Sequence, residues 1–95
     1  MAFDLQFTAR FLDQLEQLAD DVKKQSKKAI RYLSVNPRHS SLQTHKVSGI
    51  QGEYGGEIFE AYVTMKYRMT WEYGPGKNEI TLRNIDNHDE ALENP

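Results

Sequence analysis

Three short runs of alternating apolar and polar residues constrain the fold of this chain more than any other feature of its sequence. The runs lie at residues 59–63, 67–73 and 80–83. Within each run, apolar side chains recur at every second position, which is the period of a β-strand that buries one face. Residues 64–66 and the glycine- and proline-containing stretch 74–78 separate the runs and are typical of hairpin turns. We therefore predict three sequential antiparallel strands.

The N-terminal part of the chain has a different period. Residues 3–7 alternate and predict a short edge strand, and Thr8 suits the N-cap of a following helix. Apolar residues at 11–33 then recur at helical spacing. Two aspartates at 20–21 suit the first turn of a second helix, so a helical hairpin is expected, with one long helix as the alternative. The Asn-Pro pair at 36–37 ends the helical run.

The order of these elements predicts an α+β fold. It would have an N-terminal strand, a two-helix hairpin and then three antiparallel strands, with the helices packed on one sheet face. Residues 34–56 are rich in glycine and serine and are predicted to be a loop, and residues 1–95 are expected to form a single domain. Strand alternation directs a set of polar residues to the open, solvated face of the sheet. This set comprises Glu60, Tyr62, Arg68, Thr70, Glu72, Thr81 and Arg83.

Composition excludes several classes of site. The chain has no cysteine, which rules out a disulfide framework, a thiol nucleophile and a cysteine-based zinc site. Its three histidines lack the paired spacing of metal ligands, so neither a metal nor another cofactor is expected. No apolar run approaches the ~18 residues of a membrane span. We expect a cytoplasmic protein that does not bind membranes.

Charge is distributed unevenly along the chain, although the net charge is only −2. Residues 1–22 carry one arginine against five acids, and residues 51–95 carry four bases against nine acids. Residues 23–50 carry seven bases and no acid. Five of these bases fall in one wedge of the second predicted helix: Lys23, Lys24, Lys27, Lys28 and Arg31. Such a one-signed face favours an anionic partner, whereas an ordinary solvated helix face is the alternative.

Four stretches, taken in order, carry a family resemblance. They are residues 45–49, 57–63, 67–71 and 80–89. Together with the N-terminal strand and the helical hairpin, they resemble the RelE/ParE superfamily of bacterial toxins over nearly the whole chain. The Tyr-Arg pair at 67–68 and the Asn-His-Asp at 87–89 are the most specific parts.

The resemblance implies the toxin component of a type II toxin-antitoxin system. The RelE-like branch is a metal-independent endoribonuclease that cleaves mRNA in the ribosomal A site, whereas the ParE-like branch inhibits DNA gyrase. A small cognate antitoxin neutralises both. The expected partners are therefore an antitoxin, the ribosome and mRNA. Two alternatives remain open, namely a ParE-like gyrase inhibitor and a catalytically decayed module that only binds a partner.

The resemblance also assigns roles to residues. The implied catalytic residues are His88, Arg68, His45 and Lys46. The expected substrate-binding residues are Tyr62 and Arg83 and, from the one-signed helix face, Lys23, Lys27 and Arg31. Metal-free RNA cleavage needs a base, an acid and cations around the phosphate, which histidine, arginine and lysine can supply. Tyr62 stands where many members carry a basic residue, and an alternative role for Arg68 is an ion pair with Glu60 or Glu72.

Overall fold

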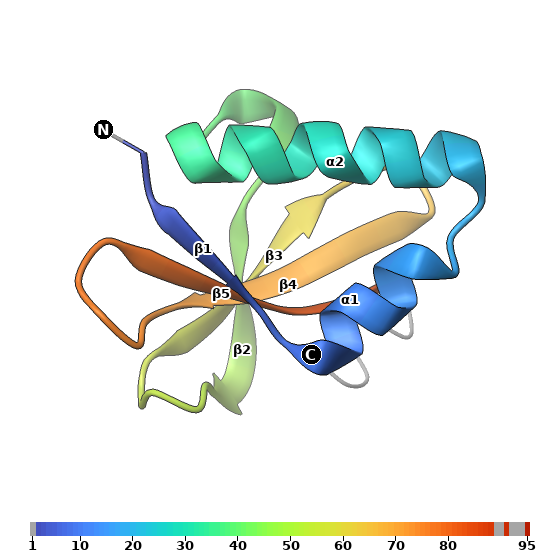
Figure 1. Cartoon of the computed structure of the whole chain (residues 1–95). Helices are drawn as coiled ribbons and strands as arrows, with labels where there is room; N and C mark the ends of the chain where they lie inside the picture. Colours follow the sequence, from blue (N-terminus) through green and yellow to red (C-terminus); the bar gives the residue numbers. More distant parts are fainter. Residues whose placement is uncertain (1, 89–90, 92–94) are drawn as a thin grey trace.

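The computed structural model describes residues 2–88, 91 and 95 of the chain. Two helices lie beside a twisted five-stranded sheet (Figure 1). In chain order the elements are β1 (Asp4–Phe7), α1 (Ala9–Glu16), α2 (Asp20–Val35), the short 3-10 helix η1 (Ser40–Leu42), β2 (His45–Gln51), β3 (Glu57–Tyr62), β4 (Tyr67–Tyr73) and β5 (Glu79–Asn87). The predicted α+β class and the order of helices and strands are confirmed.

The sheet has the strand order β1-β5-β4-β3-β2. Neighbouring strands from β2 to β5 are antiparallel, which confirms the three sequential antiparallel strands. β1 is an edge strand, as expected, but it pairs with β5 in parallel, so the sheet is mixed. A register shift between Thr70 and Trp71 lets both Leu82 and Ile85 of β5 join the core.

The prediction that residues 34–56 form a loop is wrong, because this stretch contains η1 and β2. Its strand is hard to see in the sequence because only Val47 among its residues is buried. Gly49 has a φ of 80°, and the register with β3 shifts between Val47 and Gln51. Such irregularity removes the period of two that reveals a strand.

The helices begin and end where local chemistry predicts. The Thr8 side chain accepts a hydrogen bond from the Phe11 amide at 3.1 Å and caps α1. α2 has two aspartates in its first turn and ends before Asn36, so the hairpin is formed and the single long helix is not. Within the described part of the chain, no helix has the length and apolar character needed to cross a membrane.

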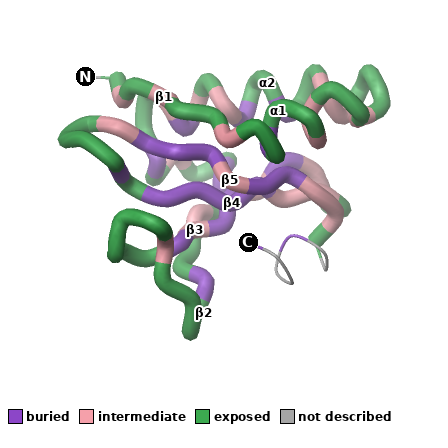
Figure 2. The backbone as a smooth tube through the Cα atoms, turned by 60° about the horizontal axis from the view of Figure 1, so that its bottom comes forward, coloured by how far each residue is buried: buried purple, intermediate pink, exposed green. Residues whose placement is uncertain are grey.

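One face of the sheet packs against both helices and forms the main core. This core includes Phe11 of α1, Ala29 and Leu33 of α2, Leu42 of η1, and Ala61, Val63, Met69, Trp71, Ile80, Leu82 and Ile85 from the region of β3–β5. Figure 2 shows that β4 and β5 are largely buried, whereas most of β2 and the segment after it are exposed.

The opposite face of the sheet is not the solvated surface that alternation predicts. Glu60, Thr70, Glu72 and Thr81 are all buried there. The loop after β2 and Pro95 contact this face. Glu72 accepts backbone hydrogen bonds from the loop, and the Thr70 hydroxyl donates to the Pro95 carbonyl at 2.9 Å. The fold therefore buries two carboxylates on neighbouring strands, two register positions apart, with Glu60 opposite Thr70 and Glu72 opposite Ile58.

Candidate active site

The candidate site is centred on the buried carboxylate of Glu60, in the middle of β3. His45 is the Cα partner of Glu60 on β2, and its Nε2 lies 3.1 Å from Glu60 Oε1. His88 Nδ1 lies 3.8 Å from the same oxygen, and Arg68 Nε lies 4.0 Å from it. Two imidazoles and one guanidinium therefore converge on a single carboxylate oxygen.

The Glu60 carboxylate is unusual because it is fully buried yet poorly bonded. Among the described residues, neither of its oxygens has a hydrogen bond of proper geometry, although His45 lies within ion-pair distance. A buried carboxylate without hydrogen bonds costs stability, and most buried polar groups have a partner. Glu60 is nevertheless surrounded by a guanidinium and two imidazoles, which carry positive charge or can transfer a proton. A buried carboxylate in such surroundings is a candidate functional group.

Arg68 is held rigidly beside this carboxylate by the turn that joins β3 to β4. Its Nη1 donates to the backbone carbonyls of Thr64, Met65 (3.2 Å) and Tyr67 (3.1 Å). Its guanidinium lies over the Tyr62 ring, 4.6 Å from the ring centroid, which is a cation–π contact. The described residues give Nη2 no hydrogen bond, so this nitrogen can donate to a bound anion.

His88 is tethered to the same turn. Its backbone amide donates to the Lys66 carbonyl at 2.7 Å. Its side chain is 46% exposed, and the described residues give its Nε2 no partner. With Nδ1 facing the Glu60 carboxylate, a neutral ring would carry its proton on Nδ1 and leave the Nε2 lone pair toward solvent.

His45 lies on the other side of Glu60, at the start of β2. Its Nδ1 is 3.1 Å from the Gln43 carbonyl oxygen, while Nε2 faces Glu60. Nδ1 is thus within hydrogen-bond distance of a backbone carbonyl, and Nε2 is within ion-pair distance of the Glu60 carboxylate. The side chain is 57% exposed, so it can reach a bound substrate.

The structure does not bring Lys46 or Arg83 into this cluster. Lys46 follows His45 on β2 and therefore points to the opposite face of the sheet, where its Nζ pairs with Glu57 at 3.1 Å. The Arg83 guanidinium pairs with buried Glu72, and its Nε donates to the Pro95 carbonyl at 3.0 Å. Both side chains therefore form ion pairs away from Glu60 and do not join the cluster at which they were predicted to lie.

The three basic residues of α2 are also separate from Glu60. Lys23, Lys27 and Arg31 lie on the helix that packs against the other face of the sheet. Lys23 reaches Glu16 of α1 at 3.9 Å. Among the described residues, no ion pair or hydrogen bond links these three side chains to Glu60, Arg68 or His88, so their part in substrate binding stays a prediction.

Tyr62 does lie at the site, as the platform under the Arg68 guanidinium. Glu60 is the central residue that sequence reasoning missed as a site residue. Alternation placed it on the correct face, but only the register of β2 against β3 shows that His45 stands opposite it. Asp89, the last residue of the predicted Asn-His-Asp motif, lies outside the described residues. Within the described part of the chain, no cluster of three or more histidine or acidic residues is suited to a metal ion.

Known proteins that resemble this chain are found by comparing structures and not by comparing sequences. No family model matches the sequence, and a search of curated proteins finds no significant match. A chain of the archaeal RelE–RelB complex from Pyrococcus horikoshii aligns with a TM-score of 0.72 at 14% identity, covering 96% of this chain and 100% of that one. The YoeB/ParE toxin from Agrobacterium tumefaciens aligns with a TM-score of 0.69 at 16% identity, covering 90% of this chain and 98% of that one.

YafQ from Escherichia coli aligns with a TM-score of 0.67 at 12% identity, covering 93% of this chain and 96% of that one. This chain has the fold of the RelE and ParE toxins. Since the identities are low, the likeness is one of architecture, and the chemistry of this chain has to be argued from its own residues.

Proposed function

We propose that this chain is a cytoplasmic toxin of a type II toxin-antitoxin pair, and that it cleaves mRNA on the ribosome without a metal ion. The observation that carries the proposal is the convergence of His45, Arg68 and His88 on the buried Glu60 carboxylate. The RelE-type architecture supports it, because solved chains of this shape are toxins and several were solved in complexes with antitoxins.

We assign each function that RNA cleavage needs to one of these side chains. His88 takes the proton of the 2′-hydroxyl at Nε2, and the 2′-oxygen attacks the adjacent phosphorus. Arg68 donates from Nη2 to the phosphate, whose negative charge increases during the attack. Protonated His45 gives the proton on Nδ1 to the departing 5′-oxygen, which replaces the Gln43 carbonyl as the acceptor of that proton, while Nε2 stays beside Glu60. The products are a 2′,3′-cyclic phosphate and a 5′-hydroxyl.

Glu60 acts in this scheme without touching the substrate. Its oxygens are buried beneath the two imidazoles and the guanidinium. A carboxylate behind an imidazole fixes the ring's tautomer and orientation and stabilises the imidazolium that forms, as the aspartate of a serine protease triad does. Glu60 is therefore a positioning residue that serves both imidazoles at once.

Expression of variants in a bacterial host tests the proposal. We expect wild-type expression to arrest growth and to produce cuts within translated mRNA that primer extension can map. His88→Ala and Arg68→Ala should each reduce the cuts by about 100-fold or more. Lys77→Ala, which removes a charge from the exposed turn between β4 and β5, is the matched control and should cut like the wild type. Undiminished cutting by His88→Ala would refute the catalytic assignment.

The gyrase-inhibitor alternative makes the opposite prediction in the same experiment. A protein of this fold that acts only by binding needs its surface but not a proton-carrying imidazole. Induced cells would then stop DNA synthesis while their mRNA stays intact, and His88→Ala would remain toxic. A chain without any effect on growth would fit the decayed partner-binding module.

A further inference from the structure

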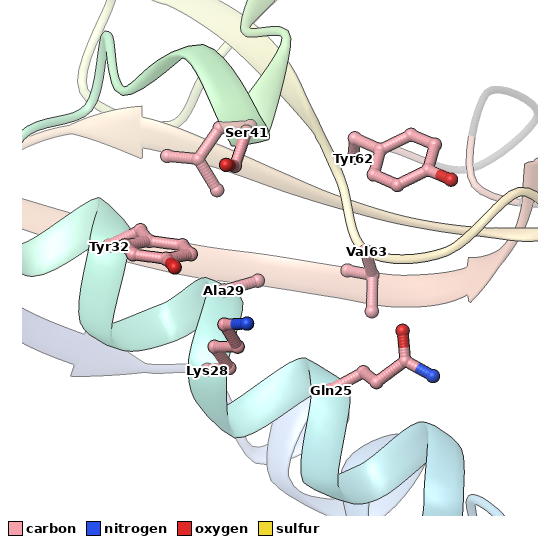
Figure 3. Close-up of a pocket in the computed structure, with 8 residues that line it drawn as sticks. Gln25, Lys28, Ala29, Tyr32, Ser41, Tyr62 and Val63 are labelled. Atoms are coloured by element: carbon pink, nitrogen blue, oxygen red, sulfur yellow. The ribbon is translucent and has the colours of Figure 1, made fainter.

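A second feature of the molecule lies next to the Glu60 site, at the sheet edge near the end of β3. A pocket with a volume of about 290 Å³ lies between α2, η1 and this end of the strand. Figure 3 shows the side chains that line it. Its residues are Gln25, Lys28, Ala29, Tyr32, Ser41, Leu42, Tyr62 and Val63. The volume is near the lower limit of pockets that hold small ligands, about 300 Å³.

The pocket combines an apolar floor with unpartnered polar groups. Ala29, Leu42 and Val63 are buried members of the core and form the floor. Around it stand the Gln25 amide and the Lys28 ammonium, for which the described residues provide no hydrogen bond or ion pair. An amide that can both donate and accept, next to a cation without an ion pair in the described residues, matches a planar polar ligand that carries a negative charge.

The aromatic wall of the pocket is held in place before any ligand arrives. The Tyr32 ring stacks on His39 with 4.0 Å between centroids and 14° between planes. His39 Nδ1 in turn accepts a hydrogen bond from the Ser41 amide at 3.1 Å. Lys28 Nζ lies 5.9 Å from the centroid of the Tyr32 ring. A fixed ring beside a cation lowers the entropy cost of binding an aromatic ligand.

Tyr62 connects this pocket to the candidate active site. It lines the pocket, and the same ring carries the Arg68 guanidinium at 4.6 Å. Arg68 in turn reaches the Glu60 carboxylate. The Tyr62 ring therefore lies between a ligand in the pocket and the Arg68 guanidinium, whose Nη2 we assign to the phosphate.

We propose that this pocket holds one unstacked nucleotide of the substrate RNA, next to the phosphodiester that is cleaved. Its base lies on the apolar floor beside the Tyr32 and Tyr62 rings, the Gln25 amide bonds the edge of the base, and Lys28 pairs with its phosphate. Stacking on aromatic side chains together with hydrogen bonds to base edges is how proteins recognise single-stranded RNA. The inference rests on the proposed ribonuclease function and names a substrate contact of that same site.

The test compares two lysine variants that change the charge equally. Lys28→Ala removes a lysine that lines the pocket, and Lys24→Ala removes one from the same exposed helix surface that does not line it. A 5′-phosphorylated ribotrinucleotide is titrated into each purified protein and followed by NMR. We expect Lys28→Ala and Gln25→Ala to weaken binding at least 5-fold and Lys24→Ala less than 2-fold, with the largest shifts at Tyr32, Ser41 and Tyr62.

Equal affinities for Lys28→Ala and Lys24→Ala would overturn the inference, because the lysine would then act only through general charge. Shifts confined to residues outside the pocket would overturn it as well. Mapping of mRNA cuts supplies the second readout, in which Gln25→Ala should alter the base preference at one position beside the cut. Unaltered preference with full cutting would refute the pocket and leave the nuclease intact. Trinucleotide bound in the pocket of a protein that cuts no mRNA would support the pocket and refute the nuclease.

Discussion

Glu60 and Glu72 are two buried carboxylates on the same face of the sheet, and their surroundings differ sharply. Glu72 of β4 pairs with Arg83 and accepts hydrogen bonds from the amides of Glu53 (3.3 Å) and Tyr54 (3.2 Å). Glu60 of β3 has no hydrogen bond of proper geometry within the described residues, and its three neighbours stand 3.1–4.0 Å from one oxygen.

The difference separates a structural carboxylate from a functional one. Glu72 fixes a loop, and its oxygens fit so closely against Gly52 that a Cβ at this position would collide with them. Within the described residues, Glu60 accepts no hydrogen bond from a backbone amide; instead it faces two partly exposed imidazoles and a guanidinium. A chain keeps an unsatisfied buried charge where function needs it, since stability alone would favour its removal.

The largest effect is expected from Glu72→Ala. The variant leaves Arg83 and two backbone amides without their acceptor, which should lower the free energy of unfolding by about 3 kcal/mol. Chemical denaturation followed by tryptophan fluorescence measures this loss. Glu57→Ala, which removes only an exposed carboxylate paired with Lys46, is the control and should stay within about 0.5 kcal/mol. Equal stability of the two variants would contradict the structural role of Glu72.

Glu60→Gln should leave the stability of the protein nearly unchanged but reduce its activity. The amide keeps the shape of the side chain, and there is no hydrogen bond of proper geometry to lose, so the free energy of unfolding should change by less than about 1 kcal/mol. Cutting of mRNA should nevertheless fall about 100-fold, because both imidazoles lose the charge that orients them. If Glu60→Gln instead destabilises the protein as much as Glu72→Ala, the two carboxylates are alike and the comparison fails.

Thr64→Ala sharpens the comparison at the turn that supports the Glu60 site. The Thr64 hydroxyl accepts hydrogen bonds from the amides of Lys66 (3.2 Å) and Tyr67 (3.1 Å), and this turn's carbonyls hold Arg68 and the backbone of His88. We expect a loss of about 1 kcal/mol in stability and about 5- to 10-fold in cutting, because small displacements of positioned groups slow catalysis. Thr64→Ser keeps the acceptor and should restore both; a silent Thr64→Ala would show that the turn needs no side-chain support.

Lys46→Ala should have the smallest effect. The ammonium pairs with exposed Glu57 on the face opposite His45, and exposed ion pairs contribute only about 0–1 kcal/mol. Stability and mRNA cutting should both stay near wild type, whereas His45→Ala, one residue away, should reduce cutting strongly. A large loss of cutting in Lys46→Ala would restore the catalytic role that the sequence suggested for this lysine.

Local sequence patterns predicted the helices and strands in which apolar residues recur at a regular spacing. The sequences of β3 and β4 alternate, Thr8 caps α1, and the aspartates at 20–21 begin α2, so these elements could be placed without coordinates. Only the start of β5 was predicted, because the register shift interrupts its alternation before Ile85. β2 escaped detection because a glycine with positive φ and a shifted register interrupt its period. Arg68, His45 and His88 were recognised through a family resemblance, whereas Glu60 looked like an ordinary polar residue on an open face.

The sequence by itself determined the helical period, the polarised charge and the face on which the side chains of β3 lie, since these depend on near neighbours along the chain. Only the tertiary structure decided that His45 stands opposite Glu60, that Arg68 and His88 share one turn, and that Lys46 and Arg83 are paired elsewhere. Strand register and the packing of loops over a sheet face bring together residues far apart in sequence, and no local pattern encodes those distances.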